Sequence, residues 1–133
     1  MFKHDHLKTP YLILRLIMGF NFFVHGLVRI PKLESFSNWM LGLFKDSLIP
    51  EILILPFSYS LPFIELIIGF LLIIGFKTMK AINAGNIIIL CLVTGSCLIE
   101  KWNMAGGQML YALFFFILAV FVENNDISLD SKL

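Results

Sequence analysis

Four long apolar runs, separated by short polar stretches, dominate the pattern of the chain. They cover residues 11–30, 57–76, 81–99 and 109–122. One helical crossing of a hydrocarbon core about 30 Å thick takes about 20 residues. The first three runs are long enough, and the fourth is expected to extend by a turn at one end. The pattern predicts a single all-α domain over residues 1–133, an integral membrane four-helix bundle.

Residues 33–45 follow a different pattern. Pro31 ends the first run, and apolar residues then recur at helical spacing among polar ones, namely Phe36, Trp39, Met40, Leu43 and Phe44. This spacing predicts a short amphipathic helix lying on the outer membrane surface between the first two spans. A loop that packs a few apolar side chains onto the bundle fits the pattern equally well.

Prolines punctuate the approach to the second span, at Pro50, Pro56 and Pro62. Because proline has no backbone N–H to donate, we expect Pro62 in the first helical turn or at a kink just before Glu65. This position places Glu65 nearer the start of the span than its middle.

The third span carries small residues and both cysteines. Ala84, Gly85, Gly95 and Ser96 are residues that let membrane helices approach closely. Cys91 and Cys97 are poorly placed to pair with each other and are interpreted as small apolar fillers. No cysteine or histidine spacing predicts a metal site.

Composition excludes an ordinary soluble domain. The 133 residues are 59% hydrophobic and 14% charged, whereas globular chains carry roughly 45–50% apolar and about 25% charged residues. A soluble domain of this size buries only about two-thirds of its extended-chain surface, so most of this chain needs lipid as its solvent. The formal charge of +1 gives no electrostatic case for nucleic-acid binding.

Charge distribution predicts the orientation. With four spans, both termini and the turn at 77–80 share one side of the membrane. That side carries Lys3, Lys8, Arg15, Lys77, Lys80 and Lys132, against Arg29, Lys32, Lys45 and Lys101 on the other. The positive-inside rule therefore predicts a multi-pass membrane protein with both termini in the cytoplasm.

Ionisable residues within or at the ends of the spans are the candidates for chemistry, because inserting each charge costs roughly 2.5–3.5 kcal/mol. The topology should gather one set of residues in the outer half of the bundle: His25, Arg29, Glu65, Glu100 and Trp102, with Gln108 nearby. Arg15 lies about 21 Å from Arg29 along the helix axis. We expect Arg15 to reach the cytoplasmic headgroups or to pair with Glu123 or a neighbouring acid.

Each candidate allows two interpretations. Glu65 either forms an ion pair with Arg29 that locks spans one and two, or takes part in proton transfer or in orienting a quinone headgroup. His25 is either a hydrogen-bonded interhelical residue or a proton relay or donor to a quinone carbonyl. Trp39 and Trp102 either belong to an interfacial aromatic belt or stack on a ligand.

Three motifs together resemble the DoxX family of small four-span membrane proteins. The first is Arg15-Leu-Ile-Met-Gly19 followed by Val24-His25-Gly26-Leu27 and Arg29. The second is Leu61-Pro62-Phe63-Ile64-Glu65-Leu66 with Gly69 and Gly75, and the third is Ile127-Ser128-Leu129-Asp130. Their order and spacing resemble the family from Leu12 to Asp130.

The resemblance implies several roles, because DoxX-like proteins are similar to small subunits of a thiosulfate:quinone oxidoreductase, to partners in thiol-handling oxidoreductase complexes, or to assembly chaperones. The function expected first is a small accessory subunit of a quinone-linked oxidoreductase. In it, Glu65 and His25 transfer protons, and His25, Arg29, Glu65, Glu100 and Trp102 surround a quinone. The chain has no cofactor motif and no cysteine expected near this cluster, so independent catalysis is not predicted.

The alternative function is a non-catalytic membrane subunit or assembly factor that docks or stabilises a larger complex. The Gly and Ala faces of spans three and four would then serve as contact surfaces. Besides the bilayer, the expected partners are other membrane or periplasmic subunits or a second copy of the chain.

Overall fold

The computed structural model describes residues 1–133 and contains only helices and short connections. Five α-helices follow one another: α1 (Lys8–Arg29), α2 (Leu33–Leu43), α3 (Glu51–Ile74), α4 (Thr78–Leu98) and α5 (Trp102–Val120). Single 3-10 turns occupy Asp5–Leu7, Ile30–Lys32, Val122–Asn124 and Asp130–Lys132. Helices α1, α3, α4 and α5 are long and apolar enough to cross a membrane. The all-α prediction with four such helices is confirmed, and within the predicted range 33–45 the residues Leu33–Leu43 form a helix rather than a loop.

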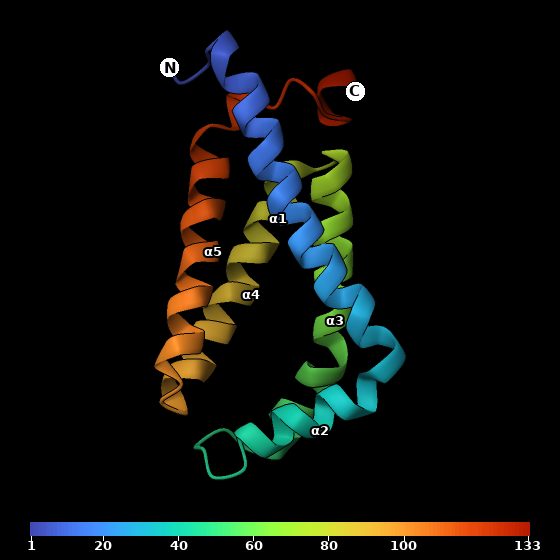
Figure 1. Ribbon diagram of the computed structural model, residues 1–133, viewed down its shortest axis with the longest axis vertical. Coiled ribbons are helices and arrows are strands. Elements are labelled where there is room, and N and C mark those ends of the chain that lie inside the picture. Colours follow the sequence, from blue (N-terminus) through green and yellow to red (C-terminus); the bar gives the residue numbers. More distant parts are fainter.

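The outward faces of these four helices stay apolar. On each, large side chains remain more than half exposed, including Ile17, Ile67, Ile87 and Phe116. Both chain ends lie at one end of the bundle, and α2 lies across the other (Figure 1). These faces suit contact with lipid chains around the helices.

Helix α3 begins earlier than predicted, at Glu51 rather than near residue 57. Pro56 and Pro62 both lie inside it, so the expectation that Pro62 occupies the first turn is wrong, and Glu65 lies past the middle of the helix. The Ser60 hydroxyl donates to the Pro56 carbonyl oxygen at 2.7 Å. This bond does not replace the N–H groups that the prolines lack, since those would pair with the carbonyls of Ile52 and Ser58; packing against neighbouring helices lets a membrane helix continue through proline.

Helix α5 extends by almost two turns before residue 109, at its N-terminal end. Gly106 and Gly107 predicted a connection, because a helical glycine costs about 1 kcal/mol relative to alanine. Two contacts offset this cost: Ala105 is buried, and the Ser96 hydroxyl donates to Gln108 Oε1 at 2.9 Å. The connection between α4 and α5 is therefore reduced to residues 99–101.

The helices pack as two pairs, α1 with α3 and α4 with α5. Glycines bring the backbones of α1 and α3 into direct contact: a Cβ atom at Gly69 would lie only 2.6 Å from the Gly19 carbonyl oxygen, and one at Gly26 only 2.7 Å from the Leu66 nitrogen. Larger residues at these positions would separate the helices.

Small residues of α4 pack against aromatic rings of the same chain. Gly85 receives the ring of Phe115, since a Cβ there would lie 2.7 Å from Phe115 Cε2. Gly95 faces the ring of Phe44, 3.0 Å from where its Cβ would be. The prediction that these residues form a face for a partner is wrong for Gly85 and Gly95, because the chain's own aromatic rings occupy that space.

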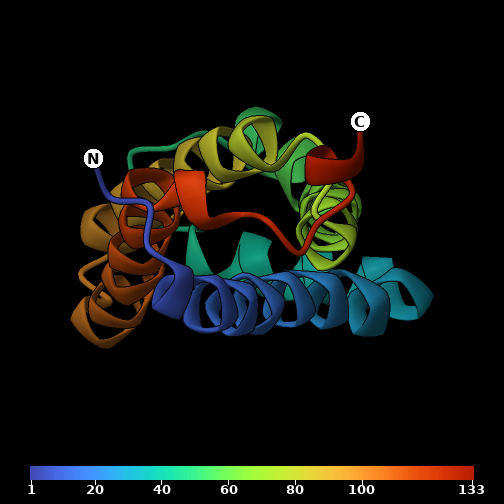
Figure 2. The ribbon, with the colours of Figure 1, turned by 90° about the horizontal axis from the view of Figure 1, so that it is seen from above.

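The C-terminal tail folds back over the end of the bundle that carries the termini. Seen from above, it runs from the end of α5 across to α3 (Figure 2). Arg15 is buried; its guanidinium donates to Asn125 Oδ1 and, at 3.0 Å, to the Ile127 carbonyl oxygen. The expectation that Arg15 reaches the headgroups or pairs with Glu123 is therefore wrong. Glu123 instead binds the N-terminal amine at 3.2 Å.

The tail also completes the turn between α3 and α4. Asp130 accepts hydrogen bonds from the backbone N–H groups of Lys77 and Thr78 at 2.7 and 2.8 Å. The N–H groups of Leu129 and Asp130 donate to the carbonyl oxygens of Ile74 and Gly75 at 3.0 and 2.8 Å. Groups that helix ends leave unpaired are thus satisfied by the tail.

Candidate functional site

A cavity of about 320 Å³ lies between the two helix pairs, toward the end covered by α2. Its wall is mostly apolar, with a few polar side chains: Asn21, His25, Arg29, Glu65, Ser96, Gln108 and Tyr111. Trp39, Leu53 and Cys91 also line it and are exposed, so it reaches the molecular surface. An apolar cavity of this size with a few polar groups is typical of a small-molecule site.

Arg29 and Glu65 form an ion pair across α1 and α3. Arg29 Nη1 lies 2.9 Å from Glu65 Oε2 and 3.3 Å from Oε1. The side chain of Glu65 is 7% exposed, and that of Arg29 is 25% exposed. The Arg29 guanidinium also lies over the Phe36 ring, 4.5 Å from its centroid. The predicted ion pair is confirmed, and the cation–π contact with α2 adds to it.

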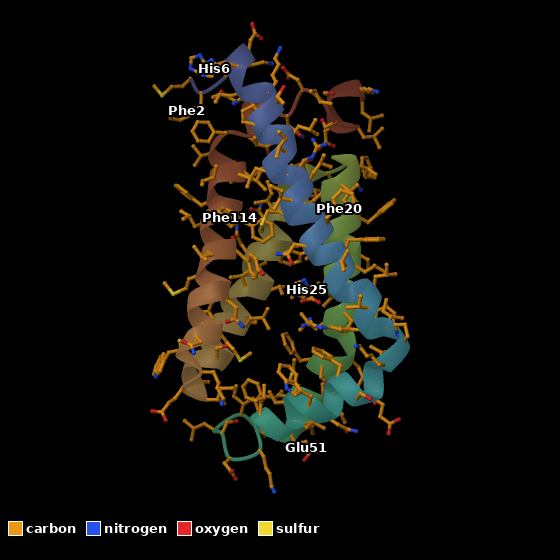
Figure 3. The ribbon with its side chains drawn as sticks, viewed as in Figure 1. Phe2, His6, Phe20, His25, Glu51 and Phe114 are labelled. Carbon is orange, nitrogen blue, oxygen red and sulfur yellow. The ribbon has the colours of Figure 1, made fainter.

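His25 is positioned by its own helix. Its Nδ1 lies 2.7 Å from the Asn21 carbonyl oxygen, and a carbonyl oxygen can only accept, so Nδ1 carries the hydrogen. In the neutral ring, Nε2 is then an acceptor, and no protein group bonds to it. The side chain is directed into the space between the helices (Figure 3), where it lines the cavity.

Helices α4 and α5 supply polar groups on the opposite wall. The Ser96 hydroxyl donates to Gln108 Oε1 at 2.9 Å, which leaves the amide nitrogen of Gln108 without a protein partner. Gln108 was expected close to the outer cluster, and it does line the same cavity. Sequence reasoning missed Ser96 and Asn21 as members of the site. The available signal was that both are polar residues within apolar runs.

Glu100 and Trp102 do not join this cluster. Glu100 lies in the turn between α4 and α5 with a φ of 57°, and Trp102 is 63% exposed. Because α5 already begins at Trp102, both residues lie beyond the cavity and outside its lining. The expectation that they surround a ligand together with His25 and Glu65 is therefore wrong.

Cys91 was expected to lie away from the outer cluster, yet it lines the cavity. Trp39 also lines it and stacks on Phe36 with ring centroids 5.8 Å apart. No group of three or more His, Cys, Asp or Glu side chains could hold a metal ion. The site therefore offers hydrogen bonds and aromatic surface to an organic ligand.

No family model, curated protein or solved structure matches the chain. The resemblance to the DoxX family stays a prediction that rests on the motifs given above.

Proposed function

We propose that the chain is a DoxX-like small subunit of a quinone-linked oxidoreductase complex in the bacterial inner membrane, with both termini in the cytoplasm. The cavity is proposed to hold the headgroup of a quinone. One observation carries this proposal: the buried Glu65, its ion-pair partner Arg29 and His25 stand together in the wall of an otherwise mostly apolar cavity. Buried ionisable groups in a cavity are candidates for function.

The residues present fit such a headgroup. Phe22, Phe36 and Trp39 line the cavity and offer flat apolar surface to a ring. His25 and Gln108 stand on opposite walls, so ring oxygens on two sides can each find a hydrogen-bonding partner. The opening beside Leu53 and Cys91 gives an isoprenoid tail a way out to lipid.

In this proposal, His25 and Glu65 accept protons from the ligand. Nε2 of His25 is free to accept a proton from a ligand hydroxyl, and the Glu65 carboxylate, whose charge Arg29 balances, is a second acceptor in the same wall. A quinol, when bound, supplies two electrons and two protons. A partner subunit would have to supply the redox group that takes the electrons, and this chain's own part would be to hold the headgroup and accept its protons.

A Glu65→Gln variant tests the proposal, with Glu100→Gln as the matched control outside the cavity. Both proteins are expressed in the native host membrane and quantified, and quinone-linked oxidoreductase activity is measured. The proposal expects Glu65→Gln to insert normally and lose activity, while Glu100→Gln keeps it. Normal activity of an inserted Glu65→Gln protein would contradict the proposal.

A second candidate function is a non-catalytic subunit that stabilises a larger complex. The ion pair also supports this second function, because Arg29 and Glu65 join α1 to α3 without any ligand. A charge exchange, Arg29→Glu with Glu65→Arg, distinguishes the two. A purely structural pair should keep the complex assembled and active after the exchange. A quinone site should lose activity, because the carboxylate has moved to the other helix.

A further inference from the structure

We infer that the cavity selects the reduced form of its ligand, a quinol whose ring oxygens carry hydrogen, and that His25 is the specificity-determining residue. The inference rests on the proposed function, since it concerns which oxidation state that site binds. It follows from a difference between the hydrogen-bond donors and acceptors in the cavity wall.

The hydrogen-bond acceptors in the cavity wall are the groups that can distinguish a quinol from a quinone. His25 Nδ1 donates to the Asn21 carbonyl oxygen at 2.7 Å, so the neutral ring presents only a lone pair at Nε2. A hydroxyl of the ligand can donate to that nitrogen. A carbonyl at the same place would bring two lone pairs together and leave both without a hydrogen bond.

Glu65 adds to the same preference. Its carboxylate is held by Arg29 and, like Nε2 of His25, can only accept. The wall formed by α1 and α3 therefore carries two acceptors within one small polar region. A ligand oxygen that lies against these two acceptors forms a hydrogen bond to them only if it carries a hydrogen.

The donors bind both oxidation states alike. The amide nitrogen of Gln108 has no partner within the protein because its Oε1 accepts from Ser96. The N–H groups of Arg29 that do not face Glu65 are donors too. A hydroxyl and a carbonyl oxygen both have lone pairs for such donors. Gln108 and Arg29 therefore add affinity without selecting between quinol and quinone.

A binding titration tests this inference. The purified protein in nanodiscs is titrated by calorimetry with decyl-ubiquinol under anaerobic reductant and separately with decyl-ubiquinone. A buried acceptor left unpaired reduces affinity by a factor on the order of ten or more. We expect the quinol to bind at least about tenfold more tightly than the quinone.

A ligand-side control needs no variant. The dimethyl ether of the quinol keeps the ring and both oxygens but has no hydrogen to donate, so it should bind as weakly as the quinone. Tight binding of the ether would overturn the inference, because bulk or ring electronics would then set the preference.

The variants are His25→Gln and, as matched control, the exposed His6→Gln at the other end of the bundle. A glutamine at position 25 can donate as well as accept, so the preference for quinol should weaken there to the part that Glu65 contributes and should persist in full in His6→Gln. Equal affinity of the wild-type protein for quinol and quinone overturns this inference and leaves the proposed function standing. Binding of neither ligand overturns the proposed function together with it.

Discussion

The guanidinium of Arg29 and the carboxylate of Glu65 meet at 2.9 Å across the α1–α3 interface, in the wall of the cavity that also holds His25. Glu65 is buried while Arg29 is partly exposed, and the two residues belong to helices that touch through glycines. It can therefore hold the helices together and shape the polar wall of the cavity at the same time.

Removing only one member of this pair should be costly. Glu65→Ala leaves the Arg29 charge without its partner; breaking a fully buried ion pair in this way costs about 3–5 kcal/mol, and the partial exposure of Arg29 reduces that cost here. We expect a large drop in the thermal unfolding temperature of the detergent-solubilised protein. The double variant Arg29→Met with Glu65→Leu should recover most of that loss, since neither charge remains. Equal instability of the single and double variants would contradict this view of the pair.

The close approach of α1 and α3 predicts the effect of adding one methyl group. In Gly69→Ala the new Cβ would collide with the backbone of α1 at Gly19 and Phe23, and overpacking of this kind costs about 1–3 kcal/mol. The matched control is Gly106→Ala, where nothing lies within 4 Å and alanine improves helix propensity by about 1 kcal/mol. Thermal unfolding should show Gly69→Ala destabilised and Gly106→Ala unchanged or stabilised; the reverse order would refute the packing described.

Asp130 makes stability depend on pH. Burial acts to raise the pKa of this carboxyl, but the hydrogen bonds from Thr78 and Lys77 outweigh it and hold the pKa below the ordinary value of 3.8. The ionised form is thus favoured in the folded protein. The stability it contributes is fully present above the pKa of the unfolded state and is lost as pH falls through the lower, folded pKa.

An Asp130→Asn variant tests this contribution. Loss of a helix-capping carboxylate costs about 1 kcal/mol, so the variant should unfold at a lower temperature than the wild type at pH 7. The gap should narrow as the pH is lowered from about 5 to 3, because the wild-type carboxyl becomes protonated. A gap that is constant over this range would contradict the role of the ionised carboxylate.

Arg15 is predicted to hold the C-terminal tail in place. Its hydrogen bonds to Asn125 and Ile127 involve a charged donor and are worth about 1.5–3 kcal/mol each. Arg15→Met should increase amide hydrogen exchange over residues 125–130. The control is Lys3→Met, which removes only an exposed pair with Asp126 and should leave exchange at these residues nearly unchanged. Equal protection in both variants would mean that Arg15 does not anchor the tail.

The main architecture could be predicted from the sequence because it depends on local patterns. Apolar runs of the length of a membrane crossing indicate helices directly, and the antiparallel order of the first two spans lets Arg29 and Glu65 face each other. The ion pair follows from those two facts, since an unpaired buried carboxylate is unfavourable.

The predictions that were wrong, for the start of α5 and for Arg15, depend on contacts that the local hydrophobic pattern of the sequence does not encode. Gly106 and Gly107 are typical of a turn, but packing of Ala105 and the Ser96–Gln108 bond extend α5 through them, and this moves Trp102 away from the cavity. The position of Arg15 depends on a tail more than 100 residues later in the chain. A residue's depth in the membrane could not indicate that the tail folds back to cover it.

The central claim is that the cavity beside Glu65 and His25 holds a quinone. Its most direct test is purification of the chain from native membranes in mild detergent, with mass spectrometry of the lipid-soluble molecules and proteins that accompany it. The wild type and Glu100→Gln should carry quinol or quinone in stoichiometric amount together with a redox protein, and Glu65→Gln should carry much less of either. A stoichiometric partner without redox groups, and quinone no higher than in a control membrane protein, would contradict the account and leave a structural subunit.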